Sequence, residues 1–168
     1  LLAEGIDAAA APVVGNTVID SLWWMHHRLD GSELDQLNLP ADRVPVLLTA
    51  HRRETQGGPM NRALDAVAAV AASRAHKICV VVPVHPNPAV SEVVTERLAS
   101  APGVKLIDPL GYRQMVALLC RCRLVVTDSG GLQEEAPALG VPVLVLREAT
   151  ERPEGIAGGA VQLVGTDP

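Results

Sequence analysis

The chain has 168 residues, of which 48% are hydrophobic but only 2% aromatic. This length allows one core, and the many small aliphatic side chains suit a parallel sheet covered by helices. Its net charge is −5 and it has no basic tract, which argues against a nucleic-acid partner. Three cysteines without paired spacing indicate reduced thiols in a cytoplasmic protein, not a disulfide framework or a zinc site, and the sequence has neither a membrane span nor a signal peptide.

The first part of the chain is expected to contain a short strand, a helix, a loop and a buried strand. Asn16 is suited to cap the helix, whose apolar side chains repeat on one face. The predicted ranges are a strand at 11–14, a helix from Thr17 to about Leu29, a loop at 31–42 and a strand at 44–50.

The rest of the chain alternates between apolar runs and segments of helical spacing. We predict strands at 78–84, 104–107, 124–127, 141–146 and 160–164, helices at 59–74, 88–98, 112–122 and 132–139 (the last closed by Gly140), and a polar loop at 147–155. Strands separated by single helices indicate right-handed crossovers and a doubly wound, Rossmann-like parallel sheet of the α/β class. Both ends resemble parts of helices, so we expect residues 1–168 to be one domain of a longer protein.

The segment 123–140 is the most informative part of the sequence. A β-branched run ends at Thr127, the polar turn Asp128-Ser-Gly-Gly follows, and a helix comes next. This order brings free backbone N–H groups and the positive end of a helix dipole to one point, which favours a phosphate or a nucleotide. The same turn would also serve as a simple helix cap, and its glycines match neither the dinucleotide fingerprint nor the phosphate loop. Glu134 and Glu135 suit the first turn of the helix and could reach ribose hydroxyls.

Polar and charged side chains gather just after the predicted strands. The carboxyl ends of parallel strands share one edge of a sheet, where ligands bind. We therefore expect these side chains to form a single site. They are His51, Arg52, Arg53 and Glu54, then His85 and Asn87, Asp108, Asp128 and Ser129, and finally Arg147, Glu148, Glu151 and Arg152.

The residue types alone leave the roles after the first of these strands open. His51 could act as a general acid or base, could donate to a phosphate, or could be a structural hydrogen-bonding residue. Arg52 and Arg53 could hold anionic oxygens. Because adjacent residues point to opposite sides, one of the two arginines could instead pair with Glu54.

The later strand ends leave similar alternatives. His85 lies between two prolines, which suits a fixed site, but it could also cap the next helix. Arg152 could clamp a phosphate or pair with Glu148 or Glu151. Ser129 lacks the pattern around a nucleophilic serine, so we expect it to act as a hydroxyl and N–H donor. Neither clustered carboxylates nor histidine pairs have the spacing of metal ligands.

Four motifs follow one another along the chain. They are His51-Arg-Arg-Glu54, Pro83-Val-His-Pro-Asn-Pro88, Asp128-Ser-Gly-Gly-Leu-Gln-Glu-Glu-Ala-Pro137 and Arg147-Glu-Ala-Thr-Glu-Arg-Pro-Glu154. Together they resemble the non-hydrolysing bacterial UDP-N-acetylglucosamine 2-epimerases, and the resemblance covers nearly the whole chain. Four motifs in order are more specific than any one of them.

The resemblance implies a fold and an activity. The family has a two-domain GT-B architecture with its active site between Rossmann-like halves, and residues 1–168 match the C-terminal, nucleotide-sugar-binding half. Its members interconvert UDP-GlcNAc and UDP-ManNAc without NAD or metal, by anti elimination of UDP to 2-acetamidoglucal and re-addition with the opposite configuration at C2. The resemblance also implies a homodimer without nucleic-acid or membrane partners. The acidic residues for proton transfer lie in the other half, so this half alone should be inactive.

The same resemblance assigns the UDP contacts. It implies that Ser129, Gly130 and Gly131 hold the diphosphate. Glu135 would bind the ribose, and Arg152 would bind the phosphates. A phosphate at this turn agrees with the expectation drawn from the residues themselves.

Other positions of the family match residues around the same turn. His51 would be the catalytic residue that faces the departing or returning diphosphate. Leu110 and Met115 would border the uracil, although relatives often have Gln and Phe there, which puts packing on the base in doubt. Arg52 and His85 would help to bind a second, allosteric UDP-GlcNAc.

Two further departures, Thr55 in place of Asn and Ala149 in place of Thr, should remove no chemistry. Two other functions stay open at this point. The chain could be the nucleotide-binding half of a GT-B glycosyltransferase, although the loop from Glu148 to Glu154 argues against this. It could also be a binding or regulatory module for UDP-sugars.

Overall fold

A sheet of six parallel strands lies at the centre of the computed structural model, which describes residues 1–167. The strands are β1 (Val44–Thr49), β2 (Ile78–Pro83), β3 (Val104–Ile107), β4 (Leu124–Thr127), β5 (Val143–Val145) and β6 (Val161–Leu163). Their order across the sheet is β3-β2-β1-β4-β5-β6. The strand order therefore reverses between β1 and β4, where open sheets of this kind bind ligands outside the carboxyl ends of the strands.

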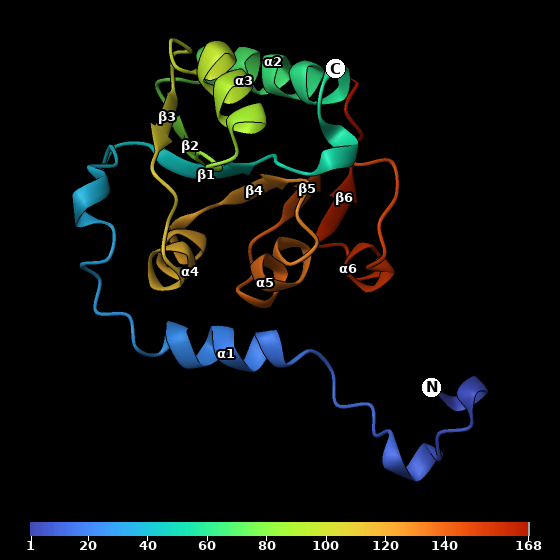
Figure 1. Cartoon of the computed structure of the whole chain (residues 1–168). Coiled ribbons are helices and arrows are strands. Elements are labelled where there is room, and N and C mark those ends of the chain that lie inside the picture. Colours follow the sequence, from blue (N-terminus) through green and yellow to red (C-terminus); the bar gives the residue numbers. More distant parts are fainter. Residues whose placement is uncertain (168) are drawn as a thin grey trace.

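Helices cover both faces of this sheet (Figure 1). One face carries α2 (Gly58–Ser73) and α3 (Pro88–Leu98), and the other carries α4 (Tyr112–Arg121), α5 (Leu132–Ala138) and α6 (Pro153–Ala157). A further helix, α1 (Thr17–His26), packs against α4 and α5 as an outer layer. Short 3-10 turns occupy Leu2–Glu4, Ala8–Ala10, Asp35–Leu37 and Arg53–Thr55. The doubly wound α/β fold expected from the sequence is confirmed.

The core consists of two apolar clusters, one on each face of the sheet. Successive side chains of a strand point to opposite faces, so Leu47 enters the cluster beside α4 and α5 while Leu48 enters the cluster beside α2 and α3. Val80 and Val81 divide in the same way. Since both faces of these strands are buried, their sequences are continuous apolar runs, which made them recognisable.

Local signals fixed several helix ends as expected. The side chain of Asn16 accepts a hydrogen bond from the backbone N–H of Val18 and so caps α1. Asn87 caps α3 in the same way. Gly140, directly after the last turn of α5, has a φ of 76°, a conformation that favours glycine.

Three expectations for the connections are wrong. Residues 11–14 form no strand: Val13 is fully exposed, and this part of the chain projects from the domain without a neighbouring strand to pair with (Figure 1). Helix α1 ends at His26, three residues early, and the turn after it forms its own hydrogen bonds through Glu33. The expected polar loop at 147–155 contains the start of α6, which Pro153 opens.

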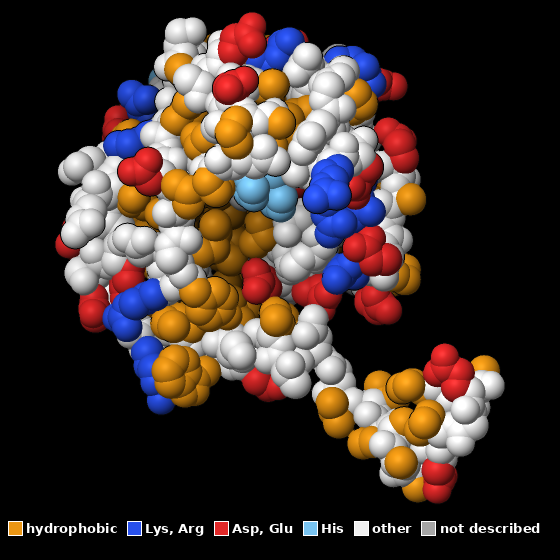
Figure 2. Space-filling model, in the orientation of Figure 1, with side chains coloured by type: hydrophobic (Ala, Val, Ile, Leu, Met, Phe, Trp, Pro, Cys, Tyr) orange, Lys and Arg blue, Asp and Glu red, His pale blue; other side chains and the backbone are white. Residues whose placement is uncertain are grey.

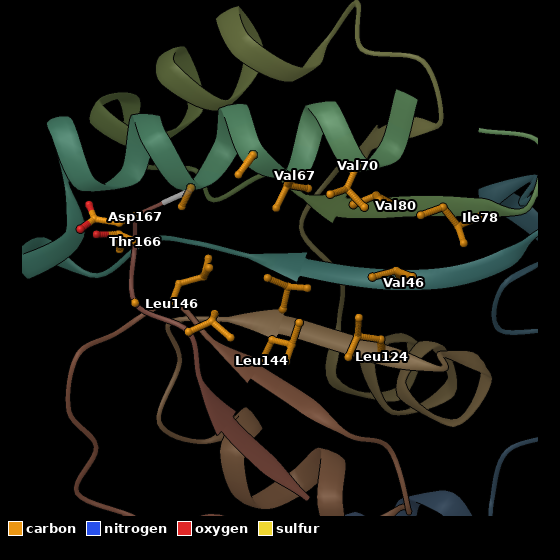
Figure 3. A pocket seen from close by; sticks show the side chains of 15 residues that line it. Val46, Val67, Val70, Ile78, Val80, Leu124, Leu144, Leu146, Thr166 and Asp167 are labelled. Carbon is orange, nitrogen blue, oxygen red and sulfur yellow. The ribbon is translucent and has the colours of Figure 1, made fainter. Parts of the chain in front are cut away.

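The face that carries α2 and α3 is covered unevenly. A groove of about 260 Å³ runs between α2 and the strands β1, β4 and β5 (Figure 3). Its lining includes Val67 and Val70 of α2, with Leu124, Leu144 and Leu146 opposite them. The groove is therefore almost wholly apolar, and the polar residues at the strand ends lie elsewhere.

Within residues 1–167, every helix is too short or too polar to cross a membrane.

Candidate functional site

The connection from β4 to α5 lies at the point where the strand order reverses. Thr127 ends β4, and its hydroxyl accepts a hydrogen bond from the N–H of Ser129 at 2.9 Å while contacting the Thr49 hydroxyl of β1 at 2.6 Å. The Ser129 N–H therefore donates within the turn itself. The Ser129 hydroxyl and the amides of Gly130 and Gly131 remain as donors.

Two arginine side chains converge on Gly130. A Cβ atom at this position would lie 3.0 Å from Nη1 of Arg152 and 3.0 Å from Nη2 of Arg52. Arg52 comes from the segment after β1 and Arg152 from the segment after β5, so the two sides of the reversal point each supply one guanidinium. Helix α5 has only seven residues, so these two full charges contribute more to an anion site than its dipole does.

Acidic neighbours hold Arg152 in place. Its Nε donates to Glu134 and its Nη1 to Glu151, which raises the pKa of Arg152. Glu134 also accepts from the Asn16 side chain, and this hydrogen bond, followed by the one from Arg152, lowers the pKa of Glu134. The sequence suggested Glu148 or Glu151 as the ion-pair partner of Arg152. The structure gives Glu151 and adds Glu134, so Arg152 is both paired and directed towards Gly130.

Gln133 ties the glycine turn to the Arg152 segment. This side chain is only 2% exposed; its Nε2 donates to the carbonyl of Ser129 and its Oε1 accepts from the hydroxyl of Thr150. The Thr150 hydroxyl in turn accepts from the backbone N–H of Arg152. Sequence reasoning missed Gln133, and a polar side chain on the buried face of a helix was the available signal.

Asp128 fixes the segment that follows β1. Its carboxylate is fully buried, and Oδ2 accepts from the backbone N–H groups of His51 and Arg52 at 2.9 and 2.8 Å and from the Thr55 hydroxyl at 2.9 Å. Three donors to one oxygen join the first and fourth strand ends rigidly. The alternative that an arginine pairs with Glu54 holds weakly for Arg52, whose Nη1 lies 3.6 Å from Oε1 of Glu54.

Histidine rings form the other side of the site. The rings of His51 and His85 are stacked, with centroids 5.2 Å apart and planes at 10°. Both residues line a cavity of about 170 Å³ together with Leu110 and Met115. In Figure 2, histidine side chains lie between an apolar hollow and a group of basic and acidic side chains. The cap alternative for His85 has support as well, since its Nδ1 accepts from the N–H of Asn87.

Glu135 follows Glu134 in α5 and lies in a different environment. Burial, and then the charge of Glu134, raise the pKa of Glu135. The charge of Glu135 also contributes, after burial, to the raised pKa of Tyr112 in α4. Glu134 thus contacts Asn16 and Arg152, whereas the charge of Glu135 acts on Tyr112 of α4. Hydroxyl groups of a ligand that donate to Glu135 would offset the cost of burying its charge.

The fold and the site together define a class. A doubly wound parallel sheet with a glycine turn and converging cations at its reversal point is a Rossmann-like α/β domain, a class that binds ligands at this edge of the sheet. The family model of UDP-N-acetylglucosamine 2-epimerase matches residues 1–168, and the chain belongs to that family.

Known proteins match nearly the whole chain in sequence and in structure. The UDP-N-acetylglucosamine 2-epimerase of Salmonella typhimurium is 45% identical over 174 residues, which cover 99% of this chain and 46% of that protein. A crystal structure of UDP-GlcNAc 2-epimerase from Neisseria meningitidis bound to UDP-GlcNAc superimposes with a TM-score of 0.91 at 38% identity, covering 99% of this chain and 46% of that one. A co-structure of S. aureus MnaA with UDP gives 0.85 at 37%, covering 99% and 45%. The chain spans about half the length of these relatives.

Proposed function

We propose that residues 1–168 form the UDP-binding half of an enzyme that interconverts UDP-GlcNAc and UDP-ManNAc. The reaction eliminates UDP to give 2-acetamidoglucal and adds UDP back to this intermediate with the opposite configuration at C2. Family membership supports the reaction, and the relatives solved with UDP-GlcNAc and with UDP support the ligand. The convergence of Arg52 and Arg152 over Gly130 is the observation that carries the proposal.

The chemistry explains why this half needs two cations. When the C1–O bond breaks, its electron pair goes to the diphosphate, whose negative charge grows in the transition state. Asp128 holds the backbone of Arg52, and Glu134 holds the guanidinium of Arg152. Cations positioned in advance need little reorganisation at that moment, so they stabilise the leaving group more than freely mobile cations would. His51, at the edge of the same turn, is placed to donate to the departing diphosphate.

The proposal also gives a position to each part of the nucleotide. We place the diphosphate at Ser129, Gly130 and Gly131, against Arg152. The ribose then follows α5 towards Glu135, and the uracil enters the cavity that Leu110 and Met115 line. This order is supported by the positions of these residues along one continuous surface at the carboxyl edge of the sheet.

A second, allosteric substrate molecule would lie directly beside the first. Arg52 and His85, which the family resemblance assigns to it, contact the active-site groups themselves: Arg52 lies over Gly130, and the His85 ring stacks on His51. Ligands at the two places would therefore affect each other through shared side chains, without a long path between them.

Proton transfer at C2 is assigned to residues outside this chain. The acidic groups at this site, such as Asp128, Glu134 and Glu151, are engaged with arginines or backbone donors. We infer that the chain binds UDP but does not epimerise alone, and that the whole enzyme is a cytoplasmic homodimer, as the family resemblance implies.

Calorimetry with UDP tests the proposal on the chain itself. We expect weak binding that Arg152→Ala and Glu135→Ala each reduce by about tenfold or more, because a hydrogen bond to a charged group contributes about 1.5–3 kcal/mol. Arg121→Ala, on the far end of α4, is a matched control and should leave UDP binding unchanged. Absence of UDP binding, or binding that neither site variant changes, would refute the placement. Conversion of UDP-GlcNAc by the parent enzyme tests the reaction.

A further inference from the structure

Asp128 has an unused oxygen in the interior of the protein. Its side chain is 0% exposed, and the three donors from His51, Arg52 and Thr55 all approach Oδ2. Among residues 1–167, the other oxygen, Oδ1, is buried without a hydrogen-bond partner. A buried carboxylate oxygen without a donor is costly, so a donor is expected to reach it in the working protein.

The donor that faces Oδ1 is the ring of His51. Nδ1 of His51 lies 3.7 Å from Oδ1, slightly beyond hydrogen-bond length. The backbone N–H of the same residue is already bonded to Oδ2, so the ring cannot move far from the carboxylate. A small rotation of the ring would close the gap, and such hydrogen bonds commonly shorten when a ligand binds.

We propose that Asp128 is the positioning residue of His51: it holds the proton on Nδ1, directs Nε2 towards the ligand and stabilises the protonated ring. Resting on the proposed function, this gives His51 a defined task. A ring whose Nδ1–H is held by Asp128 turns Nε2 towards the diphosphate oxygen, and a proton taken up at Nε2 can be donated to that oxygen.

The other groups around His51 make such a counter-ion necessary. The stacked ring of His85 opposes a charge on His51, since two protonated imidazoles would repel each other at 5.2 Å. The guanidinium groups of Arg52 and Arg152, over Gly130, oppose it too. Leu110 and Met115 complete the cavity and supply no charge. Asp128 is thus the acidic group that contacts the ring directly.

The wild-type chain tests this directly by nitrogen NMR of its imidazole groups, with His51→Gln to assign the resonances. We expect neutral His51 to carry its proton on Nδ1. A neutral ring protonated on Nε2 would overturn the proposal, and this reading needs no variant of Asp128.

Asp128→Asn gives the second measurement. The Asn oxygen can keep the three donors of Oδ2, which directs its NH₂ group at Nδ1 of His51 and reverses the tautomer. We expect neutral His51 to carry its proton on Nε2 in this variant, and UDP binding at neutral pH to weaken by about tenfold. Thr55→Val is the matched control: it removes a donor to Oδ2 but leaves Oδ1 untouched, so it should lower stability without changing the tautomer of His51.

The outcomes separate this inference from the proposed function. If both variants lose stability and neither changes the tautomer of His51, Asp128 is structural and the inference is wrong. If UDP fails to bind even the wild-type chain while Asp128→Asn reverses the tautomer, the positioning role stands and the proposed function fails.

Discussion

Substitution of Gly130 by alanine separates the binding role of the glycine turn from its structural role. The φ of Gly130 is not in the left-handed region, so the backbone accepts alanine without strain. The new Cβ would instead lie 3.0 Å from Nη1 of Arg152 and 3.0 Å from Nη2 of Arg52. Both arginine side chains are about a third exposed, at 29% and 35%, so their tips can shift towards solvent, although Arg152 then loses part of its contact with Glu151.

The expected result is a protein of nearly unchanged stability that binds UDP poorly. Gly130 is buried, but the atoms that its new Cβ meets belong to partly exposed arginine side chains, whose ion pairs contribute about 0–1 kcal/mol. We therefore expect the free energy of unfolding to change by less than about 1 kcal/mol. Loss of one charge-assisted contact, about 1.5–3 kcal/mol, corresponds to at least about tenfold weaker UDP binding. Urea unfolding and calorimetry measure the two quantities.

A glycine away from the site controls for the substitution itself. In Gly58→Ala the new Cβ meets Arg62 at 3.5 Å, an ordinary contact, so UDP binding should not change. If Gly130→Ala binds UDP like the wild type, the arginines do not form the anion site. If it instead loses more than about 2 kcal/mol of stability, the glycine is required for packing and the reasoning is wrong.

Three further predictions follow from the same region and from the thiols. Burial and Glu134 raise the pKa of Glu135, so the folded state loses stability as pH rises through that pKa. Glu135→Gln removes this loss, so urea unfolding should show the variant gaining more stability over the wild type at pH 7 than at pH 4. The same variant should bind UDP more weakly. Gln133→Ala should cost about 1–3 kcal/mol of stability, because it removes a buried side chain and the donor to a partly buried carbonyl, and equal unfolding midpoints would contradict this. Burial raises the pKa of Cys122 to about 12, so mass spectrometry after alkylation at pH 8 should find the exposed Cys120 modified and Cys122 intact.

Much of the fold was predictable because its signals are local. The buried strands are continuous apolar runs, and the Asn16 and Asn87 caps act within two residues of their own positions. The strand expected at 11–14 failed because a strand needs a neighbour, and no local pattern shows whether one is present. The short helix α6 has too few residues for a periodic pattern.

The candidate site was likewise predictable only in part. Its location at the strand ends, and the presence of a glycine turn between polar loops, follow from the order of elements. The choice between Arg52 and Arg53 does not, because it depends on which side chain the chain directs over Gly130 after β1. The buried links through Gln133 and Asp128 join residues that are distant in the chain or on different elements, so only the folded structure shows them.

The central claim is that the turn at Gly130 binds the diphosphate of UDP. Amide NMR of the chain during a UDP titration tests it most directly, because a phosphate that accepts a hydrogen bond shifts the proton of its donor. The account predicts the largest shifts at Gly130 and Gly131, with uridine causing little change there. Equal shifts from uridine, or shifts centred on the apolar groove beside α2 while these two amides stay still, would contradict it.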